Sequence, residues 1–164
     1  MHQREERFDR DSSPASAHAG DIIGAREARF IRGRRVGHLG TTDATPQPHV
    51  MPVCFALDRD AIYTLVDAKP KKTINLKRVR NVAETGRAAV LFDRYSDDWS
   101  RLGWVLARGA ASVLHEGKEH SRALALLRER YTQYRDMPLE ESPVIAVRAD
   151  SCTSWGSLEM QPDS

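Results

Sequence analysis

Short apolar runs separated by turn residues fill the chain from residue 35 to residue 66 and predict three consecutive β-strands. The runs are Arg35 to Thr42, Pro48 to Leu57 and Ala61 to Val66, with DATPQ and DRD between them. Both alternating sets of positions in the second run are apolar, which predicts a strand in the middle of a sheet. Pro48 and Pro52 lack an amide hydrogen and favour an edge, a bulge or a strand end, so a bulge near Pro52 would accommodate both features.

The apolar pattern of the remaining chain predicts three more strands and three helices. The strands are Arg87 to Asp93, Leu102 to Leu114 and Pro143 to Ala149, the last followed by SCTSWGS and a polar end. Helical spacing of apolar residues predicts helices over Ile22 to Gly33, Lys71 to about Ala83, and Lys118 to Tyr134.

Two of these helices have a defined apolar face. The second would direct Leu76, Val79 and Ala83 toward the core. The third carries a single stripe made of Leu124, Leu127, Tyr131 and Tyr134. Because the two tyrosines continue the leucine stripe, we expect them to belong to the core and not to a site.

Strands that follow one another mostly as hairpins predict an antiparallel barrel and not a parallel sheet in which strands alternate with helices. The predicted fold class is α+β, a mainly antiparallel six-stranded split β-barrel with peripheral helices. Residues 1–20 have Phe8 as their only large apolar side chain and are predicted to form a disordered tail. One domain is expected over 21–158, followed by a polar tail over 159–164.

Composition narrows the range of functions. A chain of 164 residues, 40% apolar and 29% charged, suits one compact domain, and a formal charge of +2 gives little support to general nucleic-acid binding. No run approaches about 18 apolar residues and the N-terminus lacks a signal-peptide core, so we expect a soluble cytoplasmic protein with no membrane contact. Cys54 and Cys152 lie far apart and are expected to be free thiols.

Six cations crowd into twelve residues after the third predicted strand. They are Lys69, Lys71, Lys72, Lys77, Arg78 and Arg80. Cations at a helix N-terminus oppose the helix dipole, and the first three lysines together disfavour the helix by on the order of 1 kcal/mol. A bound phosphate would reverse this effect, since it could accept hydrogen bonds from backbone amides, the Lys72 ammonium and the Thr73 hydroxyl.

Other interpretations of the cations stay open. They could form a solvated basic face, whereas a nucleic-acid surface is less favoured because no aromatic residues are interleaved with them. His115 and His120 are five residues apart, where a zinc-binding helix needs four, and His38 and His49 flank the first hairpin without a third ligand. These histidine spacings predict no metal site. The chain also lacks a Gly-x-Ser-x-Gly elbow, a Walker loop and a Gly-x-Gly-x-x-Gly turn, so the sequence identifies no catalytic residue.

Three segments carry a resemblance to a known family. They are HLGTTDATPQPHVMPVCFAL, VDAKPKKTINLKR and YSDDWSRLGWV, in that order. The chain from about residue 28 to residue 155 resembles the split-barrel flavin and deazaflavin proteins of the pyridoxamine-phosphate-oxidase-like superfamily. Within that group it is most similar to the coenzyme F420-dependent enzymes of actinobacteria.

The resemblance implies a homodimer with the cofactor in a groove at the subunit interface. It places Lys72, with Lys69 and Asn75 nearby, on the cofactor phosphate. Many relatives carry Arg or Ser where this chain has Pro70, so Lys69 or Lys71 would have to substitute. The resemblance implies that Met51, Pro52 and Val53 lie along the tricyclic ring. It places Trp99, Arg101 and Trp104 on the far side of the ring or at the partner contact, and Trp155 near the ring edge.

The function that this resemblance implies is hydride transfer between coenzyme F420 and an electron-poor small molecule, with the coenzyme supplying the reactivity. Two alternatives stay open. One is an FMN-dependent oxidase or reductase, and the other is a non-catalytic carrier of a flavin-like or haem-like ligand.

Overall fold

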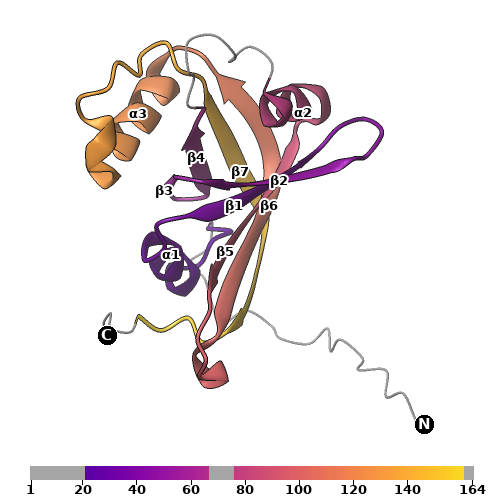
Figure 1. The fold of residues 1–164 in the computed structure, drawn as a ribbon, viewed down its shortest axis with the longest axis vertical. Coiled ribbons are helices and arrows are strands. Elements are labelled where there is room, and N and C mark those ends of the chain that lie inside the picture. Colours follow the sequence, from indigo (N-terminus) through magenta and orange to yellow (C-terminus); the bar gives the residue numbers. More distant parts are fainter. Residues whose placement is uncertain (1–20, 67–75, 161–164) are drawn as a thin grey trace.

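The computed structural model describes residues 21–66 and 76–160, which form one curled antiparallel sheet with helices around it (Figure 1). The seven strands lie in the order β2-β1-β5-β6-β7-β4-β3, and every pairing is antiparallel. The strands are β1 (Gly37–Thr42), β2 (Pro48–Val53), β3 (Ala56–Asp58), β4 (Ala61–Leu65), β5 (Arg87–Arg94), β6 (Gly103–Leu114) and β7 (Val144–Gly156). The helices are α1 (Ala25–Arg32), α2 (Lys77–Thr85), α3 (Lys118–Arg130) and the 3-10 turns η2 (Trp99–Arg101) and η3 (Thr132–Tyr134). The predicted α+β split barrel is confirmed.

The sheet has seven strands where the sequence predicts six, because the second apolar run forms two strands. β2 and β3 are joined only by Cys54 and Phe55, yet they lie at opposite edges of the sheet. The chain itself therefore connects the two edges, and this connection curls the sheet into a barrel. Phe55 is completely buried at the connection, with its ring centroid 4.6 Å from that of Phe92.

The prediction that the second run is a central strand was wrong. β2 is an edge strand whose Val50 is 64% exposed, so its second apolar face is not covered by the rest of the described chain. The edge position accommodates Pro48 and Pro52, since one side of the strand has no partner that needs an amide hydrogen. No bulge is required, because the register with β1 runs without a shift from Gly37 opposite Val53 to Thr42 opposite Pro48.

The last strand is nearly twice as long as the sequence predicts. β7 continues beyond Ala149 through Gly156 and pairs with β6 along its whole length, so SCTSWG belongs to the sheet. The register shifts between Arg108 and Gly109, where an added Cβ would clash with the Arg148 carbonyl. Glycine is therefore required for β7 to pass close to β6 at this bend.

The stripe predicted in the third helix is confirmed as core. Leu124, Leu127 and Tyr131 are buried, and Tyr134 packs against the same cluster from η3. The helix ends at Arg130, four residues earlier than predicted. The Tyr131 hydroxyl accepts a hydrogen bond from the Phe55 amide at 3.0 Å, so it also supports the connection between β2 and β3.

The described part of the second helix, α2, starts at Lys77, and residues 71–75 of the predicted helix lie outside the described residues. Val82 is buried, and Leu76 and Val79 pack partly buried against the core, as expected for an inner face. Ala83 is exposed, so its predicted place in the core was wrong. Within the described residues, no helix is both long enough and apolar enough to cross a membrane.

Candidate functional site

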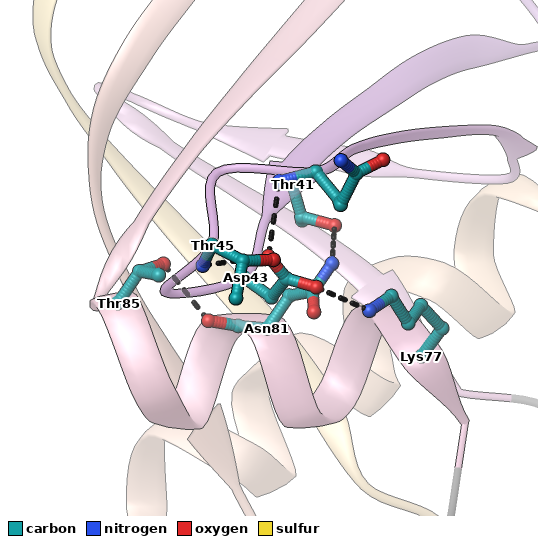
Figure 2. Close-up of polar contacts among 7 residues, drawn as sticks. Thr41, Asp43, Thr45, Lys77, Asn81 and Thr85 are labelled. Carbon is teal, nitrogen blue, oxygen red and sulfur yellow. Dashed lines mark hydrogen bonds and ion pairs between the residues drawn. The ribbon is translucent and has the colours of Figure 1, made fainter.

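The turn between β1 and β2 is fixed to the start of α2 by one carboxylate (Figure 2). Asp43 Oδ1 accepts hydrogen bonds from the Thr45 amide at 2.9 Å, the Thr45 hydroxyl at 2.7 Å and the Gln47 amide at 3.0 Å. Asp43 Oδ2 accepts a hydrogen bond from Lys77 Nζ at 2.7 Å. The same side chain thus shapes the turn and ties it to the first residue of the helix.

A buried side-chain amide adds a second contact between β1 and α2. Asn81 is 1% exposed and its Nδ2 donates to the Thr41 hydroxyl at 3.0 Å, while Thr41 itself is 3% exposed. A cavity of about 250 Å³ lies between the turn and the helix and is lined by Asp43, Ala44, Thr45, Lys77, Arg80, Asn81 and Glu84. Because these contacts join β1 and α2, they fix the start of α2 relative to the sheet.

The Lys77 ammonium beside Asp43, with hydrogen bonds from Thr45 and Gln47, holds the pKa of the Asp43 carboxyl well below its usual range. A folded-state pKa below the unfolded value stabilises the fold above the unfolded pKa of about 4 and loses that effect as pH falls. Asp43→Asn should therefore be less stable than the wild type at pH 7, and the difference should shrink between about pH 4 and pH 2. Urea unfolding at several pH values measures this, and a pH-independent difference would contradict the assignment.

The start of α2 suits an anion. Among the described residues, no side chain caps the helix at Leu76, and its first turn has no acidic residue. The first amides of such a helix and the positive end of its dipole attract an anion. Of the six clustered cations, Lys77 pairs with Asp43 and therefore has a structural role, whereas Arg80 is exposed. Lys69, Lys71, Lys72, Thr73 and Asn75, which were predicted to hold phosphate, lie outside the described residues.

The residues implied along the ring lie on the edge strand β2 but not on one face. Met51 and Val53 are opposite Leu39 and Gly37 and face the barrel interior, whereas Pro52 is opposite His38 on the outer face. Met51 and Pro52 are exposed and Val53 is buried. A planar ligand could contact all three only along the unpaired edge of the strand.

The four other predicted site residues gather at a different place. Trp104 on β6 lies opposite Trp155 on β7, and Trp99 and Arg101 form the η2 turn just before β6. Trp99 is 75% exposed and Trp155 is 54% exposed. Trp104 is three strand spacings from β2, or about 14 Å across the sheet. One chain therefore does not bring these residues together with Met51, Pro52 and Val53.

An apolar outer face connects the two groups of residues. Alternation along the paired strands puts Val50, Pro52, Leu91, Leu106, Trp104 and Trp155 on the side away from the barrel interior. In Figure 1, α1 and α3 lie on one side of the long strands and α2 at their upper end. Within the described residues, the face made by these six side chains has no helix packed over it.

Sequence reasoning missed one pair of ionisable residues on this face. His38 and Asp93 are on neighbouring strands, and His38 Nδ1 lies 3.6 Å from Asp93 Oδ1. The two residues are 55 positions apart in the chain, so spacing could not reveal the pair. The contacts of Asp43 and Asn81 between the β1–β2 turn and α2 were also missed. An Asp followed two residues later by Thr, as Asp43 is by Thr45, is typical of a turn in which the carboxylate accepts local hydrogen bonds.

The positions of the other described histidines and of Cys152 do not suggest a reactive or metal-binding role. His38 and His49 do not meet, since His49 is opposite Thr41, while His120 is buried with Nε2 2.8 Å from the Ser142 carbonyl. Burial raises the pKa of the Cys152 thiol to about 11, which makes it a poor nucleophile. Over the described ranges 21–66 and 76–160, no cluster of three or more metal-ligating side chains is found.

Similar solved structures share this fold. The conserved protein Rv2991 from Mycobacterium tuberculosis matches with a TM-score of 0.64 and 22% identity over 87% of this chain and 90% of that chain. A heme binding protein from Mycobacterium smegmatis matches with a TM-score of 0.65 and 24% identity, over 80% of this chain and 53% of that chain. HutZ, the heme storage protein of Vibrio cholerae, matches with a TM-score of 0.59 and 13% identity over 82% and 94% of the two chains. At these identities the similarity establishes the fold alone.

The fold and the comparisons define a split-barrel protein. The family model for pyridoxamine 5'-phosphate oxidase matches residues 26–153, which is most of the chain. The chain therefore belongs to the pyridoxamine 5'-phosphate oxidase family. No protein with a curated description matches it.

Proposed function

We propose that this protein is a coenzyme F420-dependent oxidoreductase that reduces an electron-poor small molecule. The observation that carries the proposal is the start of α2, which among the described residues is uncapped, has no acid in its first turn and follows a lysine-rich segment. Family membership supports a phosphate-bearing redox cofactor, and the F420 preference rests on the sequence resemblance.

The cofactor phosphate would bind at the segment that leads into α2. Lys72, with Lys69, Lys71, Thr73 and Asn75, would supply charge and hydrogen bonds there. The Asp43–Lys77 contact fixes the start of α2, the helix that follows this segment in the sequence, relative to the β1–β2 turn. When bound, the reduced deazaflavin would supply a hydride to the substrate, and the protein would contribute mainly by orienting the two reactants.

The distribution of the predicted ring contacts supports a homodimer. Met51, Pro52 and Val53 lie about three strand spacings from Trp104 in one chain, and a second copy that supplies one of the two groups would bring both to the same tricyclic ring. The apolar outer face defined above is a surface that such a copy would bury. A two-fold arrangement would then form two equivalent sites at the interface.

Two other cofactors are alternatives. FMN also carries a phosphate at the end of its ribityl chain and would use the same end of α2. A haem-type ligand is favoured by one observation, the exposed imidazole of His38 on the apolar face, which could act as an axial ligand. Two of the structurally similar proteins are heme binding or heme storage proteins.

Equilibrium titration separates these cofactors. Purified protein should be titrated with F420, FMN and haemin while the fluorescence of Trp99, Trp104 and Trp155 is recorded. Tightest binding of F420, followed by oxidation of reduced F420 with an added acceptor, would support the proposal. A preference for FMN or haemin, or binding without turnover, would reject it in favour of the corresponding alternative.

Replacing Lys72 with alanine should weaken F420 binding by about 1.5–3 kcal/mol, or about 10- to 150-fold, because one charge-assisted hydrogen bond is lost. Isothermal titration calorimetry measures the change. Lys118→Ala is the matched control, since Lys118 is an exposed lysine at the start of α3. Equal affinities of wild type and Lys72→Ala would contradict the phosphate assignment.

A further inference from the structure

A histidine and an aspartate lie close together on an otherwise apolar part of the outer face. His38 Nδ1 lies 3.6 Å from Asp93 Oδ1, and the two side chains are 41% and 48% exposed. The Nδ1 atom itself is buried and forms no hydrogen bond. The exposed part of the imidazole is therefore the part away from Nδ1, which includes Nε2.

The surroundings of this pair are apolar. His38 lies directly opposite Pro52 on β2 and opposite Leu91 on β5. Asp93 lies directly opposite Trp104 on β6. The His38–Asp93 pair thus interrupts a surface that would otherwise be apolar from Pro52 to Trp104.

Register brings His38 next to the strand proposed to contact the cofactor ring. Directly opposite residues in an antiparallel pair have Cβ atoms about 4.5–5.5 Å apart and point to the same face. A substrate stacked on the part of the ring that lies over Pro52, on the outer face of β2, would therefore be within reach of the His38 imidazole. No other described histidine is placed this way, since His49 is opposite Thr41 and faces the interior.

We propose that His38 is the proton donor in the reduction of an activated carbon–carbon double bond, with Asp93 as the residue that orients its ring. This inference rests on the proposed function. The reduced deazaflavin is the reductant, and the hydride forms a new C–H bond at the carbon β to a carbonyl. The π electrons of the double bond move to the α-carbon and carbonyl oxygen, and the α-carbon takes the proton from Nε2 of the imidazolium. The neutral imidazole then regains a proton from water.

The test compares His38→Gln with His49→Gln in the full-length protein. Each variant is titrated with F420, and then its oxidation of reduced F420 by cyclohex-2-en-1-one is followed. His38→Gln should bind F420 within about twofold of the wild type and should reduce the ketone on the order of 100-fold more slowly. His49→Gln should match the wild type in both measurements.

A second measurement needs no cofactor. In protein labelled with 15N-histidine, Asp93→Asn should change the ratio of the two neutral tautomers of His38 and leave the His49 signals unchanged. Absence of this change would overturn the orienting role of Asp93.

The outcomes separate the two proposals. If the wild type does not bind F420, the proposed function fails and the inference fails with it. If the wild type binds F420 but does not reduce cyclohex-2-en-1-one, or if His38→Gln reduces it at the wild-type rate, only the role of His38 is overturned.

Discussion

Replacing Phe55 with alanine is expected to lower the free energy of unfolding by about 3–5 kcal/mol, the range for large aromatic side chains removed from a core. Phe55 is 0% exposed and packs on Phe92, and the Arg130 guanidinium lies 4.7 Å from its ring centroid. The residue also lies in the two-residue connection between β2 and β3, so a cavity there affects both edges of the barrel. Domains of this size are stable by about 5–15 kcal/mol, which makes this loss a large fraction of the total.

Urea unfolding followed by tryptophan fluorescence and by circular dichroism would measure the change. Tyr95→Ala is the control, because Tyr95 is also aromatic but is 72% exposed, and it should change the free energy of unfolding by no more than about 0.5 kcal/mol. A loss below about 1 kcal/mol for Phe55→Ala would mean that the connection between the barrel edges contributes little to stability.

The sequence predicts most strands of this fold because their burial has a short-range signature. Alternating burial along β5 and β6 follows the alternation of apolar residues that is visible in the chain. The edge position of β2 could not be predicted from the alternation of apolar residues. Its apolar outer residues resemble those of a central strand, and only the sheet order shows that Val50 is exposed at an edge.

The second half of β7 was missed for the opposite reason. Residues 150–154 are mostly polar, so their pattern gives no strand signal, and they are strand because β6 offers them partners along its whole length. Tertiary pairing therefore overrides local sequence preference at this place.

The candidate site divides in a similar way between local and non-local features. The lysine cluster can be predicted as an anion site from its charge and from its position in the sequence before a helix. The Asp43–Lys77 contact joins residues 34 positions apart, and the Asn81–Thr41 contact joins residues 40 positions apart. Such pairs are formed only when α2 packs on β1, so no pattern in the sequence could reveal them.

The predicted tryptophans show the limit of a resemblance. It places Met51 along the cofactor ring, Trp104 on the far side of the ring or at the partner contact, and Trp155 near the ring edge, and the sheet order puts Trp104 and Trp155 several strands from Met51 in one chain. A site shared by two chains would bring these residues to one cofactor, so the oligomeric state is a critical test of the proposal.

Replacing Leu106 with aspartate should therefore convert a dimer into a monomer and weaken F420 binding by at least about tenfold. Leu106 lies in the middle of the outer face, opposite Leu91 on one side and Thr153 on the other. Two-fold symmetry would bury the introduced carboxylate twice in each dimer, and an unpaired buried charge costs several kcal/mol. In the isolated chain the same side chain is only partly buried, so the fold should survive.

Sedimentation velocity measures the oligomeric state, and circular dichroism checks that the variant is folded. Ser121→Asp adds the same charge at an exposed position of α3 and should leave both the dimer and F420 binding intact. If wild-type protein is a monomer that nevertheless binds F420, one chain completes the site and the proposed homodimer is contradicted. If Leu106→Asp remains a dimer, a different surface forms the interface, and the apolar outer face must have another role.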